Sequence, residues 1–356
     1  MAIFLREKWA KKVAETWTRR SIFADKASSD YNFDGVKDIL ISSIRTQELN
    51  NYNRDGGMNR YGTPKEVQDA AQRMTMRTDK SFSMTIDKGN NTEQDMIKNA
   101  GRVVRRELEE QVIPYFDKLV GKAWATGAGK IVGVSSALTK STFIAEINKA
   151  KSHFVNNHIP FSNVYLYIPT SMMSILVTCP EFLNLEKLGT KVLVNGMVGK
   201  LSNFPIIEVA DHDLPDGVQF MVAKKESLLF PKKIWDTNIH QNPPGISGHL
   251  MEGRFIGDGF VIGEKAMGVY TCVLASKMAT APTIATSTGT ITTNDFTVKY
   301  TDDDSDPRYS ESAKIYTAPL GDVTKKTIKF YAYKEGKDKY YDGFPSDVVV
   351  SAAASA

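Results

Sequence analysis

Apolar residues recur every three or four positions through residues 91–129, which is the longest helical pattern in the chain. This period places them on one face of an amphipathic helix, and that face is predicted to be buried. Thr92 and Asp95 form a capping pair at its start, and Gly127 and Gly129 end it. The expected packing stripe comprises Ile97, Ala100, Val104, Leu108, Gln111 or Val112, Tyr115, Leu119 and Ala123.

Pro114 interrupts this helical run in its middle. A proline lacks the backbone N–H that an α-helix uses, so we expect the rod to bend near Glu110. Roughly 33 residues at about 1.5 Å each predict a rod of roughly 50 Å, longer than most globular helices. The pattern therefore indicates an extended element, and it carries no recognisable catalytic or ligand motif.

A β pattern precedes the rod, from Val36 to Gly89. The outgoing arm, Val36–Glu48, is followed by residues 50–64, whose Asn and Gly content signals a turn or loop. The return arm alternates, with Met74, Met76, Phe82, Met84 and Ile86 on one face and Thr75, Ser83, Thr85 and Asp87 on the other. Two arms of about a dozen residues predict a hairpin on the order of 40 Å long. A lone hairpin is marginal in water, so we expect it to lie on something, including another molecule.

A basic amphipathic arm opens the chain. Residues 3–20 place Phe4, Leu5, Trp9, Val13 and Trp17 near helical spacing among Lys and Arg side chains. Such an arm can dock on its own domain, dock on a neighbour or face a polyanion, and the sequence leaves all three open. The arm lacks the apolar core of a secretory signal, and no apolar run in the chain approaches the length of a membrane span.

The middle of the chain mixes helical and β patterns. A helix is predicted over Thr142–His158, a strand over Val164–Ile168, and a short helix from Thr170 or Ser171. Residues 195–209 read as a hairpin followed by a strand, and strand pairs are predicted over 218–230 and 257–274. Because strands and helices do not alternate regularly, the fold class is predicted to be α+β and not doubly wound.

The composition changes near Lys277, where Ala, Thr, Pro and Gly mark a linker. Residues 281–356 then hold short β patterns separated by turns, which predict a small all-β sandwich. This tail has 9 basic and 11 acidic residues, a charge of −2, so the whole-chain charge of +4 leaves +6 on the body. An appendage across a linker shares little core, so its removal is expected to leave the body able to assemble.

Whole-chain composition matches an ordinary soluble globular protein of 356 residues, long enough for two or three domains. The mild positive charge permits contact with a polyanion but does not indicate a reader of nucleic-acid sequence. Both cysteines, Cys179 and Cys272, lie in apolar runs, so we interpret them as buried free thiols in a reducing compartment.

No sequence motif for catalysis, phosphate binding or metal binding is complete in this chain. The stretch TGAGKI has Trp124 and Ile131 where a phosphate loop needs Gly and Ser or Thr, and it ends a helix. Residues 302–306, DDDSD, begin like a calcium loop, but Pro307 and Ala313 occupy its turn and bidentate positions, which favours a solvated acidic turn. The five histidines form no metal-ligand motif, and no nucleophile or dinucleotide signature occurs. We therefore expect no enzyme activity, metal or cofactor.

The order of parts resembles a known family. A long two-stranded excursion, a long helix, and an α+β body containing NVYLYIPTSM, GMVGKLSNFPIIEVADHDLP and GDGFVIGEKAMGVY follow one another. Over about residues 1–280 this order resembles the major capsid protein of tailed bacteriophages, the Hong Kong 97-type fold. The C-terminal stretches AKIYTAPL and TIKFYAYKEGK are similar to immunoglobulin-like sandwiches that occur as appendages on phage structural proteins.

The resemblance implies six segments. They are an N-terminal arm (1–35), an extended loop (36–90), a spine helix with part of a peripheral domain (91–140), an axial domain (141–255), a return to the peripheral domain (256–280) and an immunoglobulin-like sandwich (281–356). It also implies contacts between subunits by loop-tip residues Tyr52, Arg54, Arg60, Tyr61 and Lys65 and by arm residues Trp9, Trp17, Arg19 and Arg20.

The function implied is a head shell that self-assembles from hexamers and pentamers around double-stranded DNA. The partners implied are the chain itself, portal and scaffold or decoration proteins, and DNA contacted without sequence preference, in a virion assembled in the host cytoplasm. Two alternatives stay open: a cellular compartment shell of the encapsulin type, and an adhesion or binding protein acting through the sandwich. An enzyme is the weakest alternative, because the motifs for one are missing.

Overall fold

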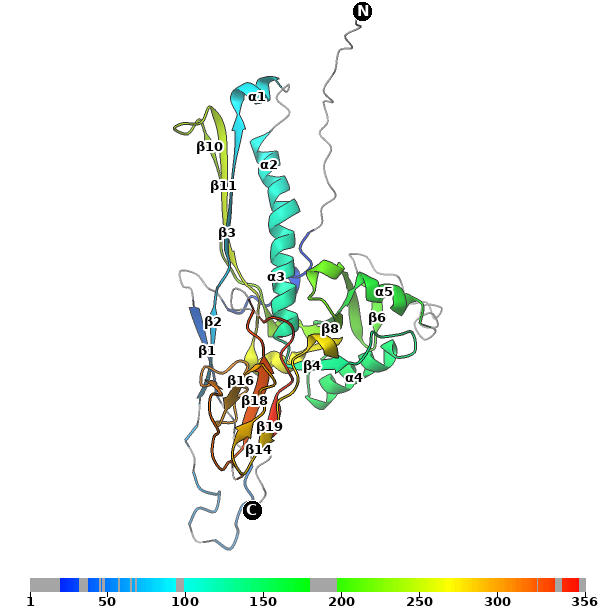
Figure 1. The fold of residues 1–356 in the computed structure, drawn as a ribbon, viewed down its shortest axis with the longest axis vertical. Coiled ribbons are helices and arrows are strands. Elements are labelled where there is room, and N and C mark those ends of the chain that lie inside the picture. Colours follow the sequence, from blue (N-terminus) through cyan, green and yellow to red (C-terminus); the bar gives the residue numbers. More distant parts are fainter. Residues whose placement is uncertain are drawn as a thin grey trace, which may run out of the picture.

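The chain forms an elongated molecule in which a long helical rod and a narrow sheet rise from a wider body (Figure 1). This computed structural model describes residues 20–31, 38–44, 46, 49–56, 58–64, 66–67, 69–93, 99–179, 197–324, 326–336 and 341–351. The residues named above that lie outside the described residues or side chains are Phe4, Leu5, Trp9, Val13, Trp17, Arg19, Val36, Glu48, Lys65, Thr92, Asp95 and Ile97.

The rod is one continuous helical element, the spine. It consists of α2 (Ala100–Glu107), a π-helical turn (Leu108–Val112) and α3 (Ile113–Thr126). The Asn99 side chain caps its start by accepting the Arg102 backbone N–H at 3.2 Å, and the Gly127 N–H closes its end on the Ala123 carbonyl. Pro114 is the second residue after the π turn, so the wide turn supplies the space that the proline ring and its missing N–H require.

The π turn corrects our expectation for the buried stripe. Val104 is buried as predicted, but Tyr115 is 42% exposed and Leu119 is only half-buried. Their C-terminal neighbours Phe116 and Val120 are buried instead. The Ile113 N–H bonds to the carbonyl of Leu108, five residues back, where an α-helix would use four. Because of this extra residue, the buried face of α3 is formed by Phe116 and Val120 and not by Tyr115 and Leu119.

A three-stranded antiparallel sheet runs beside the spine. Its order is β10 (Lys232–Gln241), β11 (Gly248–Gly257) and β3 (Asp79–Asp87). We expected β3 to return along the outgoing arm of the hairpin, and this was wrong, because β3 pairs with β11. The pairing lets Ile86 and Met251 bury against Val104 of the spine. Figure 1 shows the sheet and α2 side by side.

The extended arm is therefore shorter than predicted. β1 (Asp38–Ile44) pairs in antiparallel register with β2 (Asp69–Thr75), with Asp38 opposite Thr75 and Ile44 opposite Asp69. Met74 and Met76 are buried against the body, as the alternation predicted. Beyond Ile44 and Asp69 the chain continues as the loop whose tip was expected to contact other subunits.

A six-stranded mixed sheet forms the body, in the order β4-β13-β8-β5-β7-β6. Its strands are β4 (Lys130–Val134), β5 (Val164–Pro169), β6 (Met197–Leu201), β7 (Phe204–Val209), β8 (Val218–Lys224) and β13 (Val269–Leu274), with helices α4 (Phe143–Asn156) and α5 (Thr170–Val177). This changes the expected boundaries: β4 and β13 belong to this sheet, whereas β10 and β11 leave the predicted axial segment for the spine.

Two large cores flank this sheet. One joins Phe23 and the spine residue Trp124 to β8 and β13, and the other packs Phe143 and Phe154 of α4 against the sheet. Both cysteines are buried and free, and burial raises the pKa of the Cys272 thiol to about 12. The sheet and the base of the spine therefore form one packed unit.

The C-terminal segment is all-β, as expected. An antiparallel sheet, β17-β16-β18-β19, and a two-stranded sheet share one core around Phe330. The strands are β14 (Ile284–Ala285), β15 (Thr290–Ile291), β16 (Thr297–Thr301), β17 (Lys314–Ile315), β18 (Ile328–Tyr333) and β19 (Val349–Ser351). The expectation that this segment shares little core with the body was wrong, because Phe344 is buried in the core that holds Trp124.

Short elements complete the chain. Helix α1 (Lys88–Glu93) follows β3, and β9 (Leu228–Leu229) pairs with β12 (Phe260–Val261). The 3-10 turns are η1 (Ala24–Lys26), η3 (Asp211–Asp213), η4 (Lys225–Ser227), η5 (Gly263–Gly268) and η6 (Ala275–Lys277), and η2 is the π turn of the spine.

Candidate assembly surfaces

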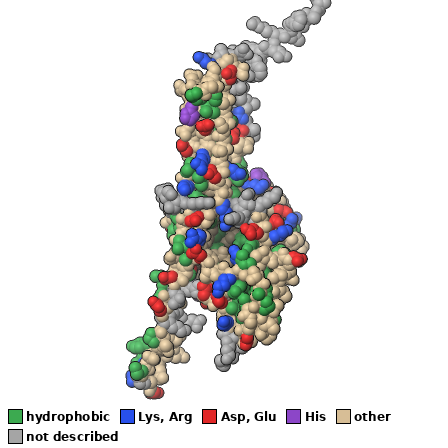
Figure 2. Space-filling model, turned by 60° about the vertical axis from the view of Figure 1, so that its left-hand side comes forward, with side chains coloured by type: hydrophobic (Ala, Val, Ile, Leu, Met, Phe, Trp, Pro, Cys, Tyr) green, Lys and Arg blue, Asp and Glu red, His purple; other side chains and the backbone are tan. Residues whose placement is uncertain are grey.

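The loop between β1 and β2 exposes a large amount of apolar surface. Met58 is 91% and Tyr61 is 84% exposed, and Leu49 is fully exposed. Half of the large exposed hydrophobic side chains among the described residues lie on this arm and loop: Leu40, Ile44, Leu49, Tyr52, Met58, Tyr61 and Val67. Figure 2 shows such side chains on the narrow projection at the lower left. An exposed apolar patch of this kind is typical of an interaction surface.

The loop tip has local order of its own. The Tyr52 and Tyr61 rings meet edge to face at 5.0 Å, and the Asn53 N–H donates to the Arg60 carbonyl at 3.0 Å. The Asn59 backbone adopts a positive φ of 58°, and the Gly62 N–H donates back to the Asn59 carbonyl. The tip is therefore a folded turn that presents its aromatic side chains outward.

The arginines of the tip differ in their contacts. The Arg60 Nε donates to the Gly56 carbonyl, so this side chain helps to hold the turn. Both Arg54 and Arg60 are exposed, as the predicted contact role requires. The tip thus combines aromatic and cationic side chains, a composition common at the centre of protein interfaces.

Strand β1 adds apolar contacts that our sequence reasoning missed. Ile39 and Ile41 face the body, while Leu40 and Ile44 point to solvent. The sequence does contain a sign of this. A strand with one buried face alternates apolar and polar residues, whereas residues 39–41 are all apolar and therefore place apolar side chains on both faces.

Of the other predicted contact residues, only Arg20 of the N-terminal arm is described, and it is exposed. Of the predicted packing residues, Leu108 packs half-buried between the spine and its sheet. Tyr115 instead forms part of the surface, where the Lys80 ammonium lies 5.4 Å from its ring centre.

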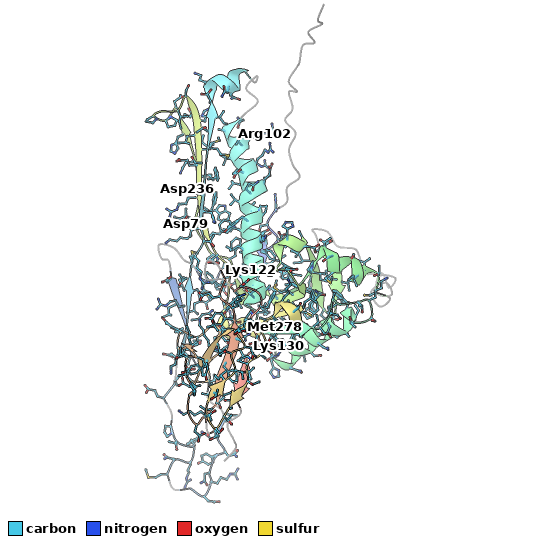
Figure 3. All side chains as sticks on the ribbon, viewed as in Figure 1. Asp79, Arg102, Lys122, Lys130, Asp236 and Met278 are labelled. Atoms are coloured by element: carbon cyan, nitrogen blue, oxygen red, sulfur yellow. The ribbon has the colours of Figure 1, made fainter. Side chains whose placement is uncertain are left out.

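The outer face of the three-stranded sheet is polar. The Arg254 guanidinium donates to Asp79 at 2.6 and 3.1 Å, and this bond holds the pKa of the Asp79 carboxyl below its usual value. Asp79 and Asp236 lie on this sheet in Figure 3, and Arg102 lies on the spine beside it. This face is compatible with water, unlike the loop tip.

A metal-binding cluster and a membrane-spanning helix are both absent from the described part of the chain. No group of three His, Cys, Asp or Glu side chains in it is arranged to hold a metal ion. Within the same ranges, no helix has the length and apolarity needed to cross a bilayer.

Comparisons with known proteins identify the fold. No family model matches the chain, and no curated protein matches it by sequence. Among solved structures, the capsid structure of the cyanophage P-SCSP1u matches with a TM-score of 0.63 at 13% identity, over 76% of this chain and 93% of that one.

Two further structures agree. The mature capsid of bacteriophage PhiM1 matches with a TM-score of 0.58 at 12% identity, over 76% of this chain and 92% of that chain. The capsid of Myoviridae phage XM1 matches with a TM-score of 0.54 at 10% identity, over 77% of this chain and 99% of that chain. The chain thus has the fold of phage capsid structures.

Proposed function

We propose that this chain is the major capsid protein of a phage head, which self-assembles into hexamers and pentamers and encloses double-stranded DNA. The observation that carries the proposal is the exposed apolar tip formed by described residues of the range 49–67, which lies away from the cores that the described part of the chain forms. The shared fold with phage capsid structures supports it.

The physical basis is repetition of moderate contacts. Covering one exposed Met58 or Tyr61 contributes about 1.5–3 kcal/mol, which alone would not hold two molecules together against the entropy of association. In a closed shell every copy both gives and receives the same contact, so the contributions sum. The +6 charge of residues 1–280 would lessen repulsion from packed DNA without reading its sequence.

We further propose that the C-terminal β-domain is an immunoglobulin-like domain added to the shared capsid fold. The capsid structures cover 76% of this chain, which leaves 24%, and residues 281–356 are 76 of 356 residues, or about 21%. An added domain of that size on a shared capsid fold fits these proportions. An adhesion function through this domain and an encapsulin-like shell are the alternatives.

Electron microscopy of the purified chain tests the proposal. We expect closed shells, tubes or capsomers, whereas discrete small particles at high concentration would contradict a shell function. Nuclease-resistant DNA inside the shells would separate a phage head from a cellular compartment. Deleting residues 50–64 should abolish assembly while the chain stays folded, and undisturbed shells from the deletion would count against the loop as the contact.

A further inference from the structure

Three parts of the molecule meet at the C-terminal end of the spine: the spine itself, the base of the arm, and the C-terminal β-domain. Lys130 and Met278 mark this junction in Figure 3. A cleft of about 800 Å³ opens there, lined by β1 and β2, by η5 and by residues 304–310 of the β-domain. The short segment Asp306–Glu311, which we name the brace, contacts both the spine end and the arm.

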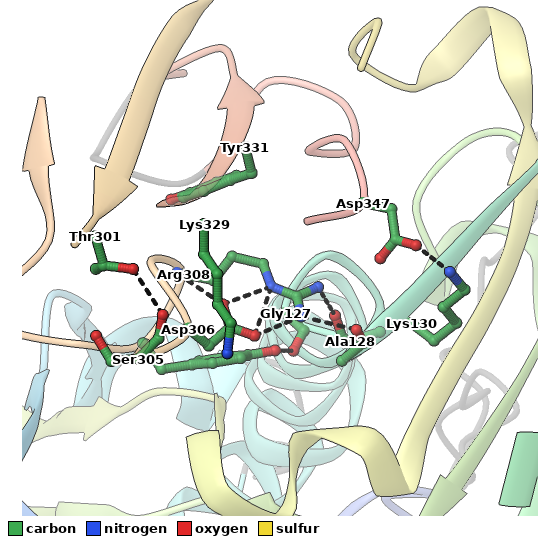
Figure 4. A network of polar contacts seen from close by, with 12 residues as sticks. Gly127, Ala128, Lys130, Thr301, Ser305, Asp306, Arg308, Lys329, Tyr331 and Asp347 are labelled. Carbon is green, nitrogen blue, oxygen red and sulfur yellow. Dashed lines mark hydrogen bonds and ion pairs between the residues drawn. The ribbon is translucent and has the colours of Figure 1, made fainter. Parts of the chain in front are cut away.

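On one side the brace binds the end of the spine. The Arg308 guanidinium donates to the Ala128 carbonyl at 3.0 Å and to the Gly129 carbonyl at 2.8 Å, and the Tyr309 hydroxyl donates to the Gly127 carbonyl at 2.7 Å (Figure 4). These three carbonyls belong to the turn between the last residue of α3, Thr126, and the first residue of β4, Lys130, and the charged Arg308 donor makes strong hydrogen bonds to two of them. The Arg308 side chain is only 3% exposed, so water does not compete for these bonds.

The brace is internally rigid. The Asp306 carboxylate accepts from the Arg308 backbone N–H at 2.9 Å and from its guanidinium at 2.7 Å. The Asp306 carbonyl accepts from the backbone N–H groups of Tyr309 and Ser310. One aspartate therefore fixes both the turn and the direction of the arginine that anchors it.

On its other side the brace holds the arm. The Glu311 N–H donates to the Ala71 carbonyl of β2 at 2.9 Å, and the Arg73 side chain donates from Nε and Nη2 to the Glu311 carboxylate at 2.8 and 2.6 Å. The bond between Glu311 and Ala71 joins backbone to backbone, so it fixes a position along the strand. Two successive contacts on β2 thus come from a domain more than 200 residues later in the chain.

Gly263 lets the parts approach each other. A Cβ placed on Gly263 would stand 2.7 Å from the Tyr309 Cβ and 3.2 Å from the Gln72 Oε1. Gln72 itself bonds to the body through the Val261 carbonyl and the Gly263 N–H. The arm is therefore attached to the body from one side and to the brace from the other.

We propose that the brace sets the angle between the arm and the spine, with Arg308 as its anchor and Glu311 as the positioning residue that holds β2. The C-terminal domain is then a working part of the body and not a passive appendage. Combined with the proposed shell function, on which this consequence rests, a fixed arm angle fixes where the loop tip meets its neighbour, and hence the curvature of the shell.

The angle can be measured in the unassembled chain. Spin labels on Ser42→Cys of β1 and Lys118→Cys of α3, both exposed positions, report the distance between arm and spine, while Cys179 and Cys272 are too buried to be labelled. We expect Glu311→Ala and Arg73→Ala each to broaden the distance distribution, and the double variant to broaden it no further, because both remove the same link. The exchange Arg73→Glu with Glu311→Arg should restore a narrow distribution when it is combined with Asp38→Asn, because Arg73 also lies 3.9 Å from the Asp38 carboxylate.

Lys314→Ala is the matched control. Lys314 pairs with Asp302 at 3.2 Å in the same domain and at similar exposure, but this pair does not touch the arm. A Glu311→Ala distribution that superposes on the unsubstituted chain would overturn the proposal. So would equal broadening in Lys314→Ala, or an exchange variant that stays as broad as the single variants.

Assembly gives the second readout. If the chain forms shells, Glu311→Ala should give a wider range of particle diameters than Lys314→Ala does. If Glu311→Ala gives a narrow distribution of particle diameters but a broad distribution of label distances, the brace holds the arm but does not set the curvature of the shell. If no shells form at all, the shell function fails, and the label distances still decide whether the brace holds the arm.

Discussion

Gly121 of the spine lies against the backbone of Asp213 so closely that a Cβ on the glycine would stand 2.2 Å from the Asp213 carbonyl oxygen. The glycine is buried in the middle of α3, where alanine would ordinarily favour the helix. Close approach of the turn Asp211–Asp213 to the spine therefore depends on this missing side chain.

Gly121→Ala should destabilise the chain in spite of its better helix propensity, by about 1–3 kcal/mol, because the turn must move away from the helix. Gly101→Ala on α2 is the matched control, since the nearest atom to its Cβ is 3.5 Å away, and it should stabilise by up to about 1 kcal/mol. Urea unfolding of the two variants measures the difference, and a Gly121→Ala chain as stable as Gly101→Ala would refute the packing argument.

The loop tip should be needed for assembly and not for folding. Met58→Ser with Tyr61→Ser removes two exposed apolar groups, so we expect an unchanged melting temperature and loss of shells by electron microscopy. Val155→Ser is the control, an exposed apolar side chain on α4 far from the loop in the sequence. If Val155→Ser loses shells to the same extent as the double variant, then replacing any exposed apolar side chain prevents assembly, and the loop tip has no special role.

Arg308→Met should weaken the whole molecule. It leaves the Ala128 and Gly129 carbonyls without their donor and Asp306 without its partner, so the free energy of unfolding should fall by about 2–5 kcal/mol.

Because Phe344 lies in the same core as Trp124, we expect the body and the C-terminal domain to unfold in one calorimetric transition. Lys334→Ala, which breaks an exposed pair with Asp342, should change stability by less than about 0.5 kcal/mol.

Stability should rise with pH through the titration of His153. Burial lowers the pKa of this imidazole below its ordinary value of 6.5, and the nearby Lys130 lowers it further, although the Met267 carbonyl and Asp347 oppose the shift. The unfolded chain therefore binds the proton more readily than the folded chain does, so this contribution is lost as pH falls below about 6.5.

His153→Gln should flatten the part of the pH dependence that lies just below pH 6.5. Glutamine can still donate to the Met267 carbonyl, which His153 Nε2 contacts at 3.0 Å, but it does not titrate. The urea midpoint of both chains measured between pH 5 and 8 gives the comparison. Identical slopes in the two chains would show that His153 is not the group responsible.

The sequence predicted elements well where periodicity is local. Helix α4 and strand β5 lie where the apolar spacing placed them, and Gly127 ends the spine as expected, but the spine begins at Ala100 and not at the predicted capping pair Thr92 and Asp95. The position of β3 could not be predicted in this way, because alternation reports which face is buried and not which strand is the neighbour. Its partner β11 lies more than 160 residues later in the chain.

Two further differences have local causes. Tyr115 was assigned to the buried face because the spacing assumed uninterrupted α-helix, and the π turn before Pro114 moved that face to Phe116. Phe344 gave no signal, because one apolar residue between Gly343 and Pro345 fits no period, yet it joins the C-terminal domain to the body core. At the loop tip, Tyr52 and Tyr61 are exposed, and their contact with other subunits stays a prediction.

The π turn at Leu108–Val112 gives the spine one residue more than its length requires. An insertion absorbed in this way leaves both flanking helices in place, so Val104 keeps its sheet and Trp124 keeps the body core while the residues between them are rearranged. The sequences of α2 and α3 can consequently change independently of each other. A descendant chain could lose one residue here without moving either end, provided that it also replaced Pro114.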